Sequence, residues 1–150
     1  MHPGDLAPDF TLEDHEGASF TLSEALARGP VVLFFYPAAM SRGCTKESCH
    51  FRDLAAEFAA QGAQRVGISM DDAERQARFA RTNALDYPLL TDVGGAVAAL
   101  YGVKRGLDAL RVKRTTFVID TDRTVLEVVA SELAMQVHAD RALRALAARR

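Results

Sequence analysis

The sequence predicts an α/β fold in which a central mixed β-sheet is flanked by helices. Residues 31–36 form a continuous apolar run, which is typical of a central strand covered on both of its faces. Apolar residues at three- and four-residue spacing follow at 51–58 and indicate an amphipathic helix. Further strand and helix patterns alternate along the rest of the chain, and this alternation favours a sheet sandwiched between helices.

The length and composition are those of an ordinary globular protein. The chain has 150 residues, of which 49% are apolar and 25% charged, so we expect a single domain spanning 1–150. The net charge of −2 supplies no general attraction to nucleic acid or anionic membranes. No apolar run approaches the length of a membrane span, and the first residues lack a secretory signal pattern. We therefore expect a cytoplasmic location, where a close cysteine pair is more often redox-active or metal-binding than structural.

The first part of the chain predicts a hairpin, a short helix, the central strand and a long helix. The hairpin is expected from two short β-type runs, 10–12 and 19–22, on either side of a polar turn. Ser23 is expected to cap the short helix. After the central strand, the helical pattern extends over 43–60 and ends at Gly62.

The rest of the chain predicts four more strands and three more helices. In chain order they are a strand at 65–69, a helix from Asp71 or Asp72 to about 83, a strand at 89–90, a helix at 95–101, strands at 115–120 and 124–130, and a helix at 137–148. In that last helix Leu143 and Leu146 should face inward, and Arg149 and Arg150 suit its negative end. Handedness rules make a thioredoxin-like arrangement the natural solution, with the N-terminal hairpin as an extension.

The two cysteines, Cys44 and Cys49, are the most informative residues for function. They are the only cysteines in the chain, and Cys44 follows the central strand where a helix is expected to begin. The partial positive charge of a helix N-terminus favours a thiolate over a thiol. A second thiol nearby gives an oxidised sulfur a partner with which to react. The pair therefore indicates redox chemistry.

The spacing of the two cysteines predicts that they cannot bond while the helix is intact. Residues five positions apart in an α-helix lie about 140° apart around the axis and about 7.5 Å along it, which separates their Cα atoms by about 8.6 Å. A disulfide requires about 4.4–6.8 Å between the Cα atoms. Formation of the Cys44–Cys49 bond must therefore unwind at least one turn of the helix.

Several residues near Cys44 in the sequence have two possible roles. An unperturbed thiol is only about 3% ionised at pH 7, so a nearby cation would help. Arg114 is the first candidate cation, although a solvated surface arginine is the commoner situation after a basic loop, and Arg42 is the second. Ser41 can contact the thiolate or cap the helix, and Pro37 can form a pocket wall or end the strand. Glu47 can orient an arginine or complement the helix dipole.

Other interpretations of these features stay open at the level of residues. The two cysteines could be small buried apolar groups, or zinc ligands with His50, although no further ligands complete a zinc site. The basic loop 104–113 could contact nucleic acid, but it lacks interleaved aromatic residues. A protein thiol–disulfide oxidoreductase, a metal or copper carrier and a holdase chaperone are further alternatives. His50 and His138 are expected on the solvated surface.

Residues 37–44 resemble the peroxiredoxin family, whose motif is Pro-x-x-x-Thr/Ser-x-x-Cys after an apolar strand. The continuation 43–53 is similar to the Q-type subfamily, the bacterioferritin comigratory proteins. Similar segments extend over nearly the whole chain and include the arginine-bearing strand at 114–120, which reverses the preference for Arg114 as a surface residue. The chain departs from many Q-type members in having Arg42 in place of proline, and apolar residues at 38–40.

This resemblance implies a thiol-dependent peroxidase that reduces hydrogen peroxide and organic hydroperoxides. It assigns a peroxidatic Cys44, a resolving Cys49, a peroxide pocket built by Pro37, Ser41 and Arg114, and a supporting Glu47. It further implies an intramolecular disulfide that thioredoxin or a similar dithiol reduces, with no metal or organic cofactor. Q-type relatives are commonly monomeric, so we expect a monomer or a weak homodimer.

Overall fold

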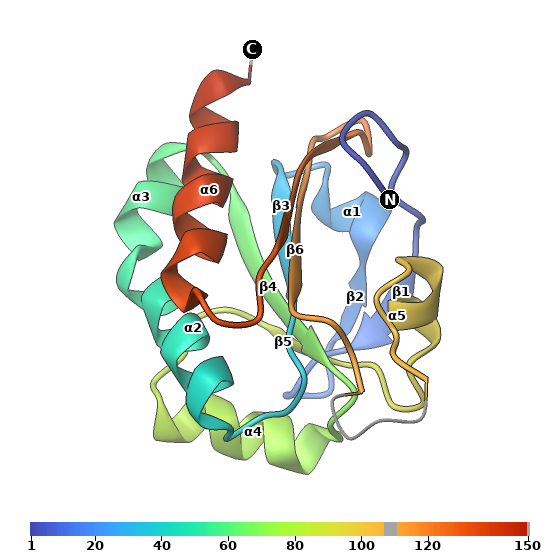
Figure 1. Ribbon diagram of the computed structural model, residues 1–150, viewed down its shortest axis with the longest axis vertical. Helices are drawn as coiled ribbons and strands as arrows, with labels where there is room; N and C mark the ends of the chain where they lie inside the picture. Colours follow the sequence, from blue (N-terminus) through green and yellow to red (C-terminus); the bar gives the residue numbers. More distant parts are fainter. Residues whose placement is uncertain (107–110, 150) are drawn as a thin grey trace.

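The computed structural model describes residues 1–106 and 111–149 and shows a five-stranded sheet with the order β5-β4-β3-β6-β7 and helices on both faces (Figure 1). Residues 107–110 of the predicted basic loop, and Arg150, lie outside the described residues. The elements are β1 (Thr11–Glu13), β2 (Ser19–Thr21), α1 (Leu22–Ala25), β3 (Val31–Phe35), α2 (Arg42–Asp53), α3 (Ala55–Ala60), β4 (Gln64–Ser69), α4 (Ala73–Thr82), β5 (Leu89–Thr91), α5 (Ala96–Leu100), β6 (Thr115–Ile119), β7 (Val125–Ala130) and α6 (Met135–Ala148). This arrangement confirms the predicted α/β class.

The sheet is mixed because its central strand β3 has a parallel neighbour on one side and an antiparallel neighbour on the other. Leu33 of β3 pairs with Val66 of the parallel strand β4 and with Phe117 of the antiparallel strand β6. Strand β5 pairs parallel with β4 at one edge of the sheet. Strand β7 pairs antiparallel with β6 at the other edge, as the short turn between these two strands predicts. The carboxyl end of β3 therefore lies beside the start of β6, and this junction positions the site.

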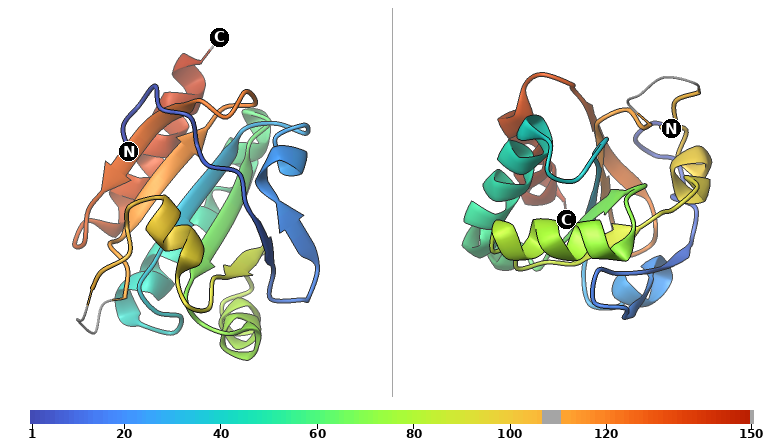
Figure 2. Two further views of the ribbon diagram at one scale, coloured as in Figure 1. Left: turned by 90° about the vertical axis from the view of Figure 1, so that its right-hand side faces the viewer. Right: turned by 90° about the horizontal axis from the view of Figure 1, so that it is seen from below.

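The apolar run of β3 divides its side chains between two hydrophobic cores. Val31, Leu33 and Phe35 belong to the core covered by α1, α5 and the N-terminal hairpin. Val32 and Phe34 belong to the core covered by α2, α3, α4 and α6. Figure 2 shows these two layers on opposite faces of the sheet. Complete burial on both faces explains why this strand lacks polar residues.

The N-terminal hairpin forms as predicted, but the cap of the short helix is different. Strands β1 and β2 pair antiparallel, with Leu12 opposite Phe20. Ser23 was expected as the cap; instead helix α1 already begins at Leu22, and the Ser23 N–H donates to Asp9 Oδ1 at 2.9 Å. A carboxylate from outside the helix thus satisfies a backbone donor that the sequence pattern assigns to a local side chain.

The predicted long helix 43–60 is two helices, α2 and α3, which is a correction to the sequence interpretation. The break lies at Leu54, whose φ and ψ of −96° and 22° are not helical. At this break Arg65 Nη1 donates to the carbonyl oxygen of Phe51 at 3.0 Å and to Asp86 Oδ1 at 2.8 Å. A long-range arginine therefore satisfies a carbonyl at the end of α2, and apolar spacing alone cannot reveal that contact.

The remaining helices begin close to the expected positions. Asp72 caps α4 by accepting the N–H of Arg75, so the second of the two predicted aspartates is the cap. In α6, Leu146 is buried, Leu143 packs partly buried against the same core, and Arg149 pairs with Asp120 at 2.9 Å. Among the described residues, no helix is long and apolar enough to cross a membrane.

Candidate active site

Cys44 lies in the first turn of α2, at the carboxyl edge of the central strand. Ser41 is the N-cap of this helix, and its Oγ accepts the Cys44 N–H at 3.3 Å. The Ser41 hydroxyl itself donates to the carbonyl oxygen of Ala38 at 2.9 Å. Ser41 therefore fills the capping role and contacts the backbone of Cys44. The Cys44 side chain is completely buried at the positive end of the helix.

The loop before α2 is fixed by Asp71, a buried residue just after β4. Asp71 Oδ2 accepts the backbone N–H of Ala39 at 2.7 Å and the hydroxyl of Ser69 at 2.7 Å. Met40 in the same loop has φ of 71°, in the left-handed region that a non-glycine residue rarely adopts. The sequence suggested Asp71 only as a possible helix start, because its contact with the loop joins segments 32 residues apart.

Arg114 contacts Cys44 directly, because β6 runs antiparallel to β3 and its first residue, Thr115, pairs with Phe35. The Arg114 guanidinium places Nη2 3.2 Å from Cys44 Sγ and Nη1 2.7 Å from Glu47 Oε1. Only 5% of the Arg114 side chain is exposed. Burial disfavours its charge, but the neighbouring charges of Glu47 and Cys44 raise the pKa of Arg114 above its usual value. Arg114 is thus a buried cation at the sulfur.

Glu47 lies one turn after Cys44 on the same helix and is fully buried. Three-residue spacing places the two side chains on one face, so a single guanidinium reaches both. Burial raises the pKa of Glu47 to about 7, although the charge and hydrogen bond of Arg114 act in the opposite direction. Its Oε1 is paired with Arg114, whereas its Oε2 is buried without a hydrogen-bond partner.

His138 on α6 is also part of this cluster, which corrects the expectation that it is solvated. It is fully buried; its Nε2 lies 2.8 Å from the carbonyl oxygen of Ser131 and its Nδ1 lies 2.8 Å from Thr116 Oγ1. Nδ1 also lies 3.5 Å from Glu47 Oε2. Burial lowers the pKa of His138, against the raising effect of its bond to Ser131. Helical spacing gives no sign of this contact, which spans most of the chain.

The other sequence candidates near Cys44 differ in their surroundings. Pro37 is buried two residues after the end of β3, in the loop that leads to Ser41. Arg42 is exposed at the first position of α2, in contrast to the buried Arg114. His50 is half-buried and pairs with Asp140 of α6 at 2.9 Å, so it is not simply solvated.

Cys49 lies on the same intact helix as Cys44, and both thiols are free. The continuous helix keeps the two Cα atoms about 8.6 Å apart, as the spacing predicts. Cys49 is half-buried, and its Sγ contacts Asn83 Oδ1 at 3.7 Å. A disulfide between the two sulfurs therefore requires α2 to open locally.

Three contacts hold this part of α2 in place. The Tyr87 hydroxyl donates to the carbonyl oxygen of Ser48 at 2.7 Å, and Arg52 Nη1 donates to the carbonyl oxygen of Asn83 at 2.6 Å. The Phe51 ring stacks on Phe34 of the central strand with ring centres 4.1 Å apart. These contacts anchor the middle and the end of α2, downstream of the first turn that carries Cys44.

The raised pKa of Glu47 predicts a specific pH dependence of stability. A carboxyl with a pKa of about 7 in the folded state, against an ordinary 4.5, favours folding fully at pH values below 4.5 and loses this contribution as the pH rises through 7. The Glu47→Gln variant does not titrate. Between pH 4 and pH 8 its free energy of unfolding should therefore rise by about 3 kcal/mol relative to wild type, as measured by urea denaturation. A pH-independent difference would contradict the buried carboxyl.

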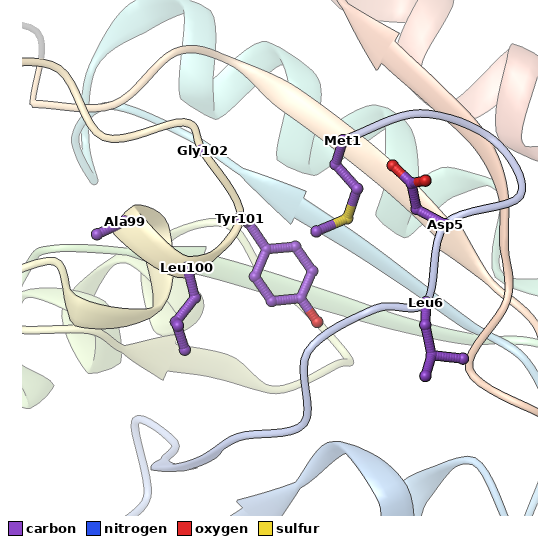
Figure 3. A pocket seen from close by; sticks show the side chains of 7 residues that line it. All are labelled: Met1, Asp5, Leu6, Ala99, Leu100, Tyr101 and Gly102. Carbon is purple, nitrogen blue, oxygen red and sulfur yellow. The ribbon is translucent and has the colours of Figure 1, made fainter.

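A separate pocket of about 450 Å³ lies between the N-terminal segment and α5 (Figure 3). Met1, Leu6, Leu100 and Tyr101 line much of it, together with Asp5. The Tyr101 hydroxyl donates to the carbonyl oxygen of Pro8, and none of the lining residues is a cysteine, histidine or arginine. This pocket has none of the chemistry found around Cys44.

Comparison with known proteins agrees with this geometry. Residues 3–128 match the AhpC/TSA family. A putative peroxiredoxin of Mycobacterium tuberculosis is 60% identical over 150 residues, covering 99% of this chain and 97% of that protein. The chloroplastic peroxiredoxin Q of Gentiana triflora is 37% identical over 143 residues, covering 95% of this chain and 65% of that protein.

Solved structures of related proteins have the same fold. The crystal structure of the peroxidoxin BcpB from Mycobacterium tuberculosis superposes with a TM-score of 0.96 at 60% identity, covering 100% of this chain and 99% of that chain. Peroxiredoxin Q of Xanthomonas campestris superposes with a TM-score of 0.84 at 29% identity, covering 93% and 90%. These similarities, together with the cysteine at the helix start, show that the chain belongs to the AhpC/TSA family and is a thiol-dependent peroxidase of the peroxiredoxin type.

Proposed function

We propose that Cys44 is the sulfur that attacks the peroxide and that Cys49 resolves the product. The contact between Arg114 and Cys44, 3.2 Å long and buried, is the observation that carries this proposal. A fixed cation and a helix N-terminus both favour a thiolate at this position. Glu47 holds Arg114 in place through the bond to its other terminal nitrogen.

In the first step the Cys44 thiolate donates an electron pair to one peroxide oxygen, and the O–O bond breaks. Sulfur is oxidised by two electrons to a sulfenic acid, while the second oxygen leaves as an alkoxide or hydroxide and takes a proton from water. Arg114 stabilises the charge that develops on the leaving oxygen. The long bond between the Cys44 N–H and Ser41 can be exchanged for a bond to a peroxide oxygen, and Pro37 forms one wall.

In the second step the Cys49 thiol attacks the sulfenic sulfur, a disulfide forms and water leaves. The first turn of α2 must open for this step, because both cysteines belong to one helix. An external dithiol of the thioredoxin class then reduces the disulfide through a mixed disulfide and restores both thiols. The cytoplasmic setting expected from the sequence fits this need for a reducing partner.

We infer from the family membership that the substrates are hydrogen peroxide and organic hydroperoxides. One related structure, the bacterioferritin comigratory protein of Xanthomonas campestris, is described with alkyl peroxide reduction activity. The complete burial of Cys44 disfavours the alternative function as a protein disulfide reductase, because a folded protein disulfide cannot reach the sulfur. An insulin-reduction assay beside a peroxide assay separates the two functions, and we expect activity only with peroxide.

The Cys49→Ser variant should consume one equivalent of peroxide and then stop in the presence of thioredoxin. The reason is that Cys44 reaches the sulfenic acid without a partner thiol, so no disulfide is available for thioredoxin. Stopped-flow measurement of peroxide consumption checks this result, and dithiothreitol, a small dithiol, should restore turnover as a control. Continued cycling of the variant with thioredoxin would show that Cys49 is not the resolving cysteine.

A further inference from the structure

A connected set of buried polar groups leads from the sulfur to α6. Cys44 contacts Arg114, Arg114 contacts Glu47 Oε1, and Glu47 Oε2 faces His138 Nδ1 at 3.5 Å. The peroxidase chemistry described above uses the first three residues but gives His138 no role. His138 is nonetheless fully buried, and burial of a histidine is costly unless its ring nitrogens have hydrogen-bond partners.

The hydrogen bonds of His138 fix where its first proton lies. Nε2 is 2.8 Å from the carbonyl oxygen of Ser131, and a carbonyl oxygen can only accept, so Nε2 carries a proton. Nδ1 is 2.8 Å from Thr116 Oγ1, which can donate its hydroxyl proton to it. In the neutral ring Nδ1 is therefore an acceptor whose single lone pair takes the Thr116 hydroxyl proton, and Glu47 Oε2 lies 3.5 Å from the same nitrogen.

This arrangement is short of one proton when Glu47 is ionised and His138 is neutral. Two acceptors then face each other, and Glu47 Oε2 is buried with no hydrogen-bond donor. An unsatisfied buried carboxylate oxygen costs free energy, so the cluster gains from a proton on either Oε2 or Nδ1. That proton also balances the charge: with a Cys44 thiolate and a cationic Arg114, it brings the four groups from a net charge of −1 to zero.

We propose that Glu47 and His138 hold one proton between them and that this proton determines how strongly Arg114 acts on Cys44. The inference rests on the proposed role of Cys44 as the attacking sulfur. While the proton is held, Glu47 and His138 together carry no net charge, and the positive charge of the Arg114 guanidinium acts mainly on the Cys44 sulfur. After the proton is lost, the Glu47 carboxylate takes a larger share of that charge. His138 is then a positioning residue that acts through Glu47.

The other charged groups around the pair are consistent with this assignment. Glu132, in the loop before α6, accepts the backbone N–H of Arg114 at 3.0 Å, and its charge raises the pKa of both Glu47 and His138. Arg114 and Arg141 act on His138 in the opposite sense. Because burial raises the pKa of Glu47 to about 7 and lowers the pKa of His138, the shared proton resides mainly on Glu47 near neutral pH.

Two isosteric variants should shift the reactivity of Cys44 in opposite directions. Glu47→Gln mimics the protonated carboxyl at every pH, since its amide can donate to His138 while its oxygen still accepts from Arg114. His138→Asn puts a permanent amide donor near the position of Nδ1, which stabilises the Glu47 carboxylate without a titratable proton. The first variant keeps the charge of Arg114 directed to Cys44, and the second diverts it.

The test measures alkylation of Cys44 by iodoacetamide and its oxidation by hydrogen peroxide from pH 5 to pH 9, in a Cys49→Ser background. The midpoint of the alkylation curve should fall by about half a pH unit in Glu47→Gln and rise by about half a unit in His138→Asn, a threefold change in thiolate in each direction. The double variant should behave like Glu47→Gln, because His138 acts only through Glu47. Shifts in the same direction, or additive shifts, would overturn the proposal.

His50→Gln is the matched control, because His50 also joins α2 to α6, through Asp140 at the surface. Its alkylation curve should coincide with that of the background protein.

Should His138→Asn not fold, NMR titration of ¹³C-labelled glutamate carboxyls decides the question in wild type. One carboxyl should titrate near neutral pH and be missing in Glu47→Gln, and ordinary titration of every glutamate would overturn the proposal. Failure of the proposed function can be told apart from failure of this proposal. If Cys44 is not the attacking sulfur, a Cys44→Ser protein would still react with peroxide.

Discussion

The Cys44→Ser variant is expected to lose peroxide consumption by at least about a thousandfold. A serine hydroxyl has nearly the same shape but is un-ionised at neutral pH and cannot be oxidised to a sulfenic acid. Arg114 would still be held by Glu47, so the site would keep its form without its nucleophile. The measurement is the rate of hydrogen peroxide loss with thioredoxin and its reductase in excess.

The Cys49→Ser variant is the control for the first equivalent of peroxide: it should still consume one equivalent before it stops, whereas Cys44→Ser should consume none. Both variants should retain the secondary structure of the wild type, as circular dichroism can show. A Cys44→Ser protein that consumes peroxide at a rate near that of the wild type would assign the chemistry to Cys49 or to another group.

Replacing Arg114 by alanine should lower the rate of Cys44 oxidation by about 100- to 1000-fold. The variant loses the cation 3.2 Å from the sulfur, which both favours the thiolate and stabilises charge on the leaving oxygen. Arg114→Lys should recover only part of the rate, because a lysine ammonium cannot contact Glu47 and the sulfur with the fixed geometry of a guanidinium. Stopped-flow measurement with hydrogen peroxide in single-turnover conditions gives this rate directly.

Arg42→Ala provides the matched control for Arg114. Arg42 is also an arginine near Cys44 in sequence, but it is exposed at the first position of α2. Its removal should change the rate by no more than about threefold, the range of an exposed charge. Equal losses in the two variants would mean that a diffuse positive potential, and not the buried contact of Arg114, activates the sulfur.

Much of the fold follows from local patterns in the sequence. The all-apolar run of β3 predicts a doubly covered strand, and both of its faces are buried. The adjacent aspartates Asp71 and Asp72 predict the start of α4, and Asp72 is its cap. The exceptions are places where a distant residue replaces a local one. Asp9 takes the role expected of Ser23, and Arg65 satisfies the end of α2. No pattern of neighbouring residues reveals such contacts.

The candidate site divides in the same way. Cys44, Ser41 and Glu47 belong to one helix start, so their spacing and the family motif both point to them. Arg114 is 70 residues away; the residues alone made it a candidate cation but favoured a surface position, and only the resemblance to a known strand favoured a place at the sulfur. His138 was missed, because its burial depends on how α6 packs against α2 and β6, which periodicity within α6 does not specify.

The central claim is that the Cys44 thiolate is oxidised and then reaches Cys49 only after the first turn of α2 opens. The most direct test is to identify the product that forms with one equivalent of hydrogen peroxide. Trypsin cleaves after Lys46, between the two cysteines, and yields peptides 43–46 and 47–52. Mass spectrometry should find these peptides joined by a disulfide, lighter by two hydrogen atoms than the separate thiols, in a monomeric protein. Separate peptides, with oxygen on Cys44 and a free thiol on Cys49, would contradict the account.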